Sequence, residues 1–179
     1  MSYGIKKSAM NDKHINAGSH LPILCKAFEY GDGPILEMGS GAWSTPILDM
    51  LVRRREKRKI LTLENDKVWY EKVKRTYQSD YHDVLYIQDW DDAPIDDTFW
   101  GLVFIDHRPA LRRKTDIVRL KWQAYYILAH DTEPEINQFY GYDRVEKHFK
   151  YNFLYDDIKP NTTIYSNFSK LDELHTYRG

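Results

Sequence analysis

The spacing of short apolar runs constrains the fold of this chain more than any other feature. Runs rich in β-branched residues recur at intervals of roughly 20 to 25 residues, with polar, helix-compatible segments between them. This order is typical of βαβ units, in which helices join parallel strands. We expect strands at residues 34–38, 60–64, 84–88, 102–106 and 125–130, and helices at 45–54, 66–77, 114–123 and 142–150.

Two more apolar runs, at residues 151–155 and 162–166, lie close together near the end of the chain. Between them stands Lys159-Pro160-Asn161, a turn signal. The pair is therefore predicted to form an antiparallel hairpin. A mostly parallel sheet that finishes in a C-terminal hairpin is the expected architecture.

The length of 179 residues predicts one domain over residues 1–179. Within it, the core is expected at 34–167 and a C-terminal tail at 168–179. Residues 1–33 contain "SHLPILCKAFEY", which indicates a helix with Pro22 in its first turn. We expect this segment to form a helical lid, with His14, His20, Asn16 and Ser19 available for polar contacts, although a packing helix explains it nearly as well.

Composition excludes several classes of protein. The 26 basic and 27 acidic residues nearly cancel, so no global field favours nucleic acid or an anionic membrane. The single cysteine, Cys25, rules out an internal disulfide framework. Neither a signal peptide nor a membrane span is evident, so a cytoplasmic protein is expected. The basic run at 53–59 follows a predicted helix, where cations complement the helix dipole.

The stretch "ILEMGSGAWST" places a glycine pair between a strand and a helix. Gly39 and Gly41 let a ligand approach the backbone beside the positive end of the helix. The dinucleotide fingerprint has a third glycine where this chain has Ser44, and the Glu37 carboxylate would repel a pyrophosphate. A cationic or zwitterionic ligand is therefore favoured, with close helix packing as the alternative.

Two further strands end in acidic residues. Glu64 is the last residue of the strand predicted at 60–64, a position at which a carboxylate can accept both hydroxyls of a ribose. Asp66 is the better candidate for the cap of the next helix. Asp89 can accept from an exocyclic amine beside the face of Trp90, which would suit adenine, although acids and tryptophans are also common in loops.

These motifs resemble those of the class I S-adenosylmethionine-dependent methyltransferases. "ILEMGSGAWST" is similar to motif I of that family, and "LTLE" is similar to its ribose-binding acid. The resemblance covers residues 33–167 and implies an α/β, Rossmann-like, doubly wound sheet of seven strands with the last strand reversed. It implies S-adenosylmethionine as cofactor, bound by Glu37, Gly39, Ser40, Gly41, Ser44, Thr45, Glu64, Asn65, Asp89, Trp90 and Asp106.

Asp106 and Asp131 follow neighbouring predicted strands, an arrangement that suits a divalent cation such as Mg²⁺. "VFIDH" is similar to the corresponding strand of catechol-type O-methyltransferases, where the Asp ligates Mg²⁺. The next pair in that family is Asp-Asn, and here it is Asp131-Thr132. The alternative is that Asp106 contacts the methionine portion of the cofactor and Asp131 caps a loop.

The same two loops supply the remaining candidates. His107 and His130, with Asp106 and Asp131, are the predicted catalytic residues, because imidazole and carboxylate groups can accept a hydroxyl proton. A cluster of cations could clamp an anionic acceptor or lie in a solvated loop, although cations are unfavourable at a helix N-terminus. Its members are Arg108, Arg112 and Arg113.

The sequence thus predicts a methyltransferase that acts on an oxygen of a small-molecule or sugar-like, anionic acceptor. No nucleic acid or membrane partner is expected, and the N/D-P-P-Y/F motif of nucleic-acid methylation is replaced by Asp106-His107-Arg108-Pro109. Two alternatives stay open. One is a nicotinamide-dependent oxidoreductase, and the other is a non-catalytic ligand-binding module on a methyltransferase scaffold.

Overall fold

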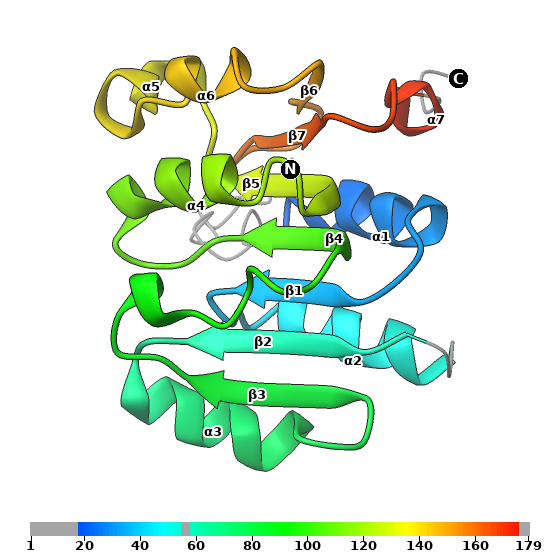
Figure 1. Cartoon of the computed structure of the whole chain (residues 1–179), viewed down its shortest axis with the longest axis vertical. Helices are drawn as coiled ribbons and strands as arrows, with labels where there is room; N and C mark the ends of the chain where they lie inside the picture. The colour runs from blue at the N-terminus through cyan, green and yellow to red at the C-terminus, as the bar shows by residue number, and fades with distance from the viewer. Residues whose placement is uncertain (1–17, 55–57, 176–179) are drawn as a thin grey trace, which may run out of the picture.

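The computed structural model describes residues 18–54 and 58–175. Its centre is a seven-stranded sheet in the order β3-β2-β1-β4-β5-β7-β6 (Figure 1). Strands β1 to β5 are parallel, and β7 lies antiparallel between β5 and β6. The strands are β1 (Ile35–Met38), β2 (Ile60–Glu64), β3 (His82–Tyr86), β4 (Trp100–Ile105), β5 (Ala124–His130), β6 (Tyr151–Tyr155) and β7 (Thr162–Ser166). The predicted Rossmann-like sheet with a C-terminal antiparallel hairpin is confirmed.

Helices cover both faces of the sheet. The described helices are α1 (Leu21–Tyr30), α2 (Ser44–Arg54), α3 (Lys67–Tyr77), α4 (Arg113–Arg119), α5 (Pro134–Tyr140), α6 (Asp143–Glu146) and α7 (Asp172–His175), with 3₁₀ turns η2 (Trp90–Asp92) and η3 (Ala110–Arg112). Buried side chains of α1, α2 and α7 join one core cluster, and those of η2, α4 and α6 join the other. The fold therefore has three layers.

Some boundaries differ from the predictions. β3 and β4 each begin two residues earlier than expected, and His82 extends β3 because its ring is buried and hydrogen-bonded. α4 ends at Arg119, short of the predicted residue 123. Of the helix predicted at 142–150, only the short α6 forms, and the chain passes into turns in which the backbone nitrogen of His148 donates to the oxygen of Val145. α5 precedes the predicted range and ends at Gly141, whose φ of 72° separates it from α6.

The described part of the predicted lid packs on the sheet. Four side chains of α1, those of Ile23, Leu24, Ala27 and Phe28, are buried in the core. His14 and Asn16 lie outside the described residues, so the lid over the ligand stays a prediction. Residues 172–175 of the predicted tail form α7, whose Leu174 is buried. No helix in the described ranges has the length and apolar composition that a bilayer span requires.

The carboxyl ends of the central strands meet at one edge of the sheet, on the left in Figure 1. Met38 at the end of β1 is in register with Leu63 of β2 and with Ile105 of β4. Ile105 is in turn beside Ala129 of β5. The loops that follow these strands therefore emerge side by side, and they carry most of the predicted site residues.

Candidate active site

The glycine turn after β1 is pressed against the end of β4. Gly39 has a φ of 89°, in the left-handed region that side chains disfavour. A Cβ atom on Gly39 would lie 2.5 Å from the Cα of His107 and 2.6 Å from its backbone nitrogen. Only glycine fits this position without moving the backbone of the neighbouring loop.

Glu64 holds this turn from the end of β2. Its Oε2 accepts from the backbone nitrogen of Ser40 at 3.0 Å and from the Ser40 hydroxyl at 2.6 Å. Its Oε1 accepts from the backbone nitrogens of Asn65 and Asp66, each at 2.8 Å. These four donors fix the orientation of the carboxylate at the edge of the pocket.

Glu37 lies beneath the turn and is fully buried. Its Oε2 accepts from the hydroxyls of Thr45, at 2.9 Å, and Thr62, at 2.8 Å. Thr45 in turn accepts from the backbone nitrogen of Gly41 at 3.0 Å. Burial raises the pKa of Glu37 to about 7, against the opposing effect of the Ser44, Thr62 and Thr45 hydroxyls.

Part of the predicted cofactor set lies below the turn. Glu37, Ser44 and Thr45 were expected to contact the ligand, and the structure places all three side chains in the interior, so their contact with a ligand stays a prediction. The β1 register explains this: Glu37 alternates with Leu36 and Met38 and so faces the α2 side of the sheet. Their role in this geometry is to support the turn from below.

The polar chain continues from Thr62 across the sheet. The Thr62 hydroxyl lies 2.8 Å from Nε2 of His82, whose Nδ1 lies 3.1 Å from the carboxylate of Asp49 on α2. Because a hydroxyl has one hydrogen, Thr62 donates to Glu37 only while Nε2 of His82 donates to Thr62. Burial lowers the pKa of His82, and Asp49 opposes that shift.

A pocket of about 560 Å³ opens above the turn, a size ordinary for small-molecule sites. The predicted residues that line it are Gly39, Ser40, Glu64, Asn65, Asp106, His107 and Arg108. Two lining residues were not predicted as ligand contacts. Asp66 caps α3 as expected, and the indole nitrogen of Trp69 donates to the backbone oxygen of Ser40 at 3.1 Å. Their place in the first turn of the helix after Glu64 was the available signal.

Asp89 and Trp90, the predicted adenine contacts, do not line this pocket. Asp89 is exposed and accepts from the backbone nitrogen of Asp91, which caps η2. Trp90 is buried, stacks on His107 with ring centroids 4.0 Å apart, and donates to the backbone oxygen of Arg108 at 2.8 Å. The loop after β3 thus turns its aromatic ring into the core.

The histidines predicted to act as bases are both buried. The His107 side chain has no exposed surface, and its Nε2 lies 3.1 Å from Asp116 of α4. Burial lowers the pKa of His107, against the opposing effect of Asp116. His130 is 3.2 Å from the Thr162 hydroxyl and packs edge-on against His20, with ring centroids 4.6 Å apart. His107 lines the pocket, but its side chain has no exposed surface, and His130 does not line the pocket.

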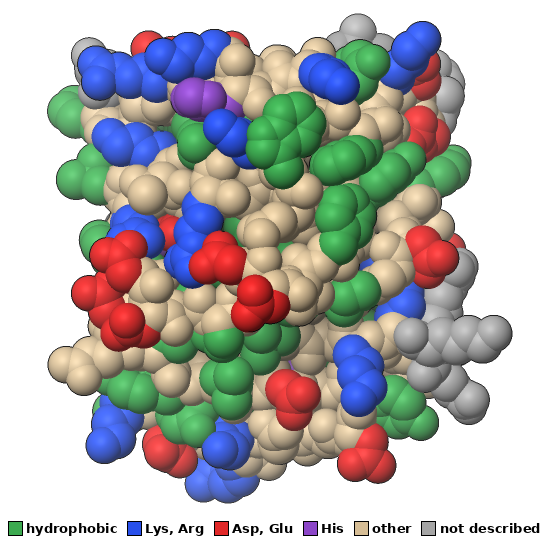
Figure 2. Space-filling view, viewed as in Figure 1, with side chains coloured by type: hydrophobic (Ala, Val, Ile, Leu, Met, Phe, Trp, Pro, Cys, Tyr) green, Lys and Arg blue, Asp and Glu red, His purple; other side chains and the backbone are tan. Residues whose placement is uncertain are grey.

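Two of the predicted acceptor-binding arginines are already paired. Arg112 donates to Asp116 and to Asp91. Figure 2 shows that acidic and basic side chains lie together on the left of the view. Arg113 is 4% exposed and forms ion pairs with Asp106 at 2.7 Å and Asp131 at 3.2 Å. Both guanidinium groups therefore already have acidic partners within the protein. Arg108 is exposed at the pocket and has no ion pair within the described ranges.

The predicted metal site does not fit this arrangement. Asp106 and Asp131 do lie near each other, but the Arg113 guanidinium binds both carboxylates. Among residues 18–54 and 58–175, no group of three or more potential ligands is placed to hold a metal ion. A divalent cation would meet a fixed positive charge instead of a free pair of carboxylates.

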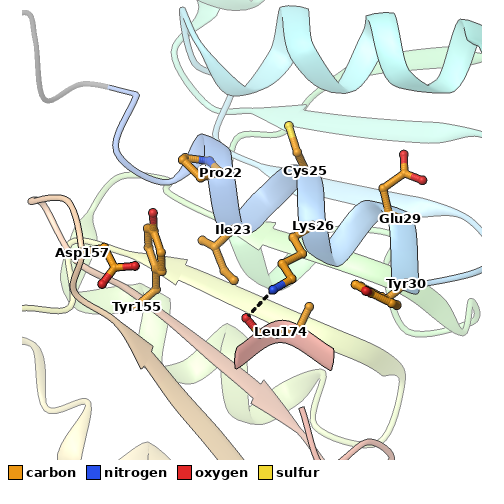
Figure 3. A pocket seen from close by; sticks show the side chains of 9 residues that line it. All are labelled: Pro22, Ile23, Cys25, Lys26, Glu29, Tyr30, Tyr155, Asp157 and Leu174. Atoms are coloured by element: carbon orange, nitrogen blue, oxygen red, sulfur yellow. Dashed lines mark hydrogen bonds between the residues drawn. The ribbon is translucent and has the colours of Figure 1, made fainter. Parts of the chain in front are cut away.

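A second groove, of about 650 Å³, lies between α1, β6 and α7 (Figure 3). In it, Nζ of Lys26 donates to the backbone oxygen of Leu174 at 2.9 Å. Apolar side chains such as Ile23 and Tyr155 form much of its wall. It contains no glycine turn and none of the predicted cofactor residues, so the pocket above Gly39 is the better candidate for a nucleoside.

Comparison with solved structures identifies the fold. The chain is similar to a methyltransferase from Pyrococcus furiosus, with a TM-score of 0.58, 11% identity and coverage of 90% of this chain and 88% of that one. It is similar to precorrin-6y C5,15-methyltransferase from Geobacter metallireducens GS-15, with a TM-score of 0.55, 11% identity and coverage of 92% and 93%. The N-terminal domain of human METTL16 in complex with SAH matches with a TM-score of 0.57, 12% identity and coverage of 84% and 69%.

The chain has the methyltransferase fold. No protein-family model and no curated protein sequence matches it. At such low identity the similarity establishes the architecture alone, and the chemistry must be argued from the site. In the methyltransferase fold of this chain, the glycine turn and the pocket lie at the carboxyl edge of the sheet, where open α/β sheets bind their ligands.

Gly39→Ala and Gly41→Ala provide a matched test of the turn. Alanine at Gly39 requires a backbone shift at His107, whereas a Cβ on Gly41 meets only the Ser44 hydroxyl, at 2.8 Å. We expect Gly39→Ala to destabilise the protein by about 2 kcal/mol or more and Gly41→Ala by about half of that or less. Urea denaturation of both variants measures the difference, and equal losses would contradict the described geometry.

Glu37→Gln tests the buried carboxylate. Because its folded pKa is about 7, above the ordinary 4.5, the folded state binds the proton more tightly, and the wild-type protein loses stability as pH rises through this window. Relative to Glu37→Gln, the wild-type free energy of unfolding should fall by roughly 3 kcal/mol between about pH 4 and pH 8. Exposed Glu71→Gln is the control. Parallel pH curves for wild type and Glu37→Gln would contradict the assignment.

Proposed function

We propose that this chain binds S-adenosylmethionine in the pocket above Gly39 and transfers its methyl group to an oxygen of a small, sugar-like, anionic acceptor. The observation that carries the proposal is the glycine turn held by Glu64 at the carboxyl edge of a methyltransferase fold. The backbone lies open to a ligand there, and a fixed carboxylate stands beside it.

Glu64 is the proposed partner of the ribose. Its four acceptor positions are occupied by two backbone donors on Oε1 and by the Ser40 nitrogen and hydroxyl on Oε2. A ribose hydroxyl must therefore take the place of one donor. The Ser40 hydroxyl is the one that can rotate away without moving the backbone. In the free protein, the Ser40 hydroxyl thus occupies the position on Glu64 that we propose for a ribose hydroxyl.

Asp106 is the proposed proton acceptor. Its side chain lines the pocket and is 29% exposed. Burial raises its pKa to about 6, against the opposing charges of Arg113 and His130. A carboxylate that titrates near neutral pH can take the proton of an acceptor hydroxyl as the new O–CH₃ bond forms. S-adenosylmethionine supplies an already activated methyl group, so positioning and this proton transfer are what the chain must add.

Arg108 is the proposed contact for the negative charge of the acceptor. Its exposed side chain stands at the pocket, and its backbone oxygen is held by Asn65 at 3.0 Å and by Trp90 at 2.8 Å. Both anchors fix the loop while the guanidinium stays accessible. Guanidinium groups bind phosphate and carboxylate oxygens in pairs, which favours an anionic acceptor.

Calorimetric titration with S-adenosylhomocysteine and with NAD tests the proposed cofactor. We expect S-adenosylhomocysteine to bind more tightly than NAD by tenfold or more, about 1.4 kcal/mol. Glu64→Ala should abolish the binding, because the ribose loses its acceptor. Asp89→Ala should leave the affinity within about twofold, because Asp89 lies outside the pocket. Preferential binding of NAD would favour the oxidoreductase alternative and overturn the proposal.

A screen with radiolabelled S-adenosylmethionine against phosphorylated and carboxylated sugars tests turnover. Asp106→Asn should reduce transfer to an accepted substrate by about 100-fold or more, while its affinity for S-adenosylhomocysteine stays within a few-fold of wild type. Retained transfer in Asp106→Asn would refute its assigned role. Cofactor binding without transfer to any acceptor would support a non-catalytic binding module instead.

A further inference from the structure

Arg113 is a buried cation between the ends of two neighbouring strands. It is the first residue of α4 and is 4% exposed. Its guanidinium reaches the carboxylates of Asp106, after β4, and Asp131, after β5. A positive charge at a helix N-terminus opposes the helix dipole, so its presence there requires compensation from specific partners.

The hydrogen-bonding capacity of this guanidinium is fully used. Nε donates to the backbone oxygen of His107 at 2.8 Å, and Nη1 donates to the backbone oxygen of His130 at 3.1 Å and to Asp131 at 3.2 Å. Nη2 donates to the backbone oxygen of Asp106 at 3.1 Å and is paired with its Oδ1 at 2.7 Å. The five N–H groups of arginine thus have five oxygen partners.

The backbone of Asp131 adopts an unusual conformation beside this cation. Asp131 has a φ of 56°, in the left-handed region that only a few per cent of non-glycine residues adopt. Such conformations persist where the surroundings determine them, often at functional sites. Here the turn directs the Asp131 carboxylate back to Arg113.

We propose that Arg113 is a built-in cation that takes the position of a divalent metal and fixes the Asp106 carboxylate at the pocket. This inference rests on the proposed function, in which Asp106 faces the acceptor. Arg113 is a positioning residue, since the pocket above Gly39 is lined by Asp106 and not by Arg113 itself. The site therefore works without a metal, because the charge that would attract one is already neutralised.

Manganese titration tests this proposal without any assay of methyl transfer. Mn²⁺ alone is added to the full chain, and free Mn²⁺ is measured by electron paramagnetic resonance. Wild-type protein should show no site tighter than about 1 mM. The Arg113→Ala variant should gain a Mn²⁺ site of that affinity, because Asp106 and Asp131 lose the cation that they share. The double variant Arg113→Ala/Asp131→Asn should again show no such site.

Two further variants separate charge from geometry. Arg112→Ala removes the neighbouring arginine, whose partners are Asp116 and Asp91, and should gain no manganese site. Arg113→Lys keeps the charge but has three donors instead of five, so it should melt below wild type and still bind no Mn²⁺. If Arg113→Ala does not fold, the Mn²⁺ titrations of wild type and Arg113→Lys test the proposal, and a Mn²⁺ site in either protein would contradict it.

A manganese site in wild-type protein that Asp106→Asn removes would overturn the proposal. A folded Arg113→Ala variant without a gained site would overturn it as well. Binding of S-adenosylhomocysteine is measured separately, so failure of the proposed cofactor leaves the manganese result interpretable. Conversely, a protein that binds the cofactor and also holds Mn²⁺ at Asp106 would retain the proposed function and lose only the role of Arg113.

Discussion

A fully buried carboxylate, Glu37, lies beneath the glycine turn. The position of the turn depends on the hydrogen bonds that this carboxylate accepts. Burying an ionisable group requires hydrogen-bond donors, and Thr45 from α2 and Thr62 from β2 supply them. Thr45 also accepts from the backbone of Gly41, so the same network holds the turn open toward the pocket. The polar interior thus joins β1, β2 and α2 below the place where a ligand would lie.

Above the sheet edge, charge is neutralised mostly within the protein. Arg113 binds Asp106 and Asp131, and Arg112 binds Asp91 and Asp116. Charged residues that the sequence offered as ligand contacts therefore pair with one another and fix the loops after β4 and β5. The pocket presents the backbone of the turn, the partly exposed Asp106 carboxylate and the exposed Arg108 guanidinium, and the buried Glu64 carboxylate lies at its edge. Such a set suits a zwitterionic nucleoside beside an anionic acceptor.

The sequence was sufficient for the succession of strands along the chain and for the terminal hairpin, because both follow from apolar periodicity and turn signals. It also brought most of the predicted site residues to one edge of the sheet, because the carboxyl ends of parallel strands meet there. It could not specify which way each side chain turns. Trp90 was predicted to contact adenine and His107 to act in catalysis, yet their rings stack on each other in the core. The cation at the start of α4 was a usable signal: its unfavourable place on the helix dipole indicated a buried partner, which Arg113 has.

The crystal structure of the protein with S-adenosylhomocysteine tests the central claim most directly. The account predicts a nucleoside in the pocket above Gly39, with a ribose hydroxyl on Glu64 in place of the Ser40 hydroxyl, and no ligand atom in contact with Glu37 or Asp89. A nucleoside bound instead in the groove between α1, β6 and α7, or a pocket above Gly39 that stays empty at saturating ligand, would contradict it.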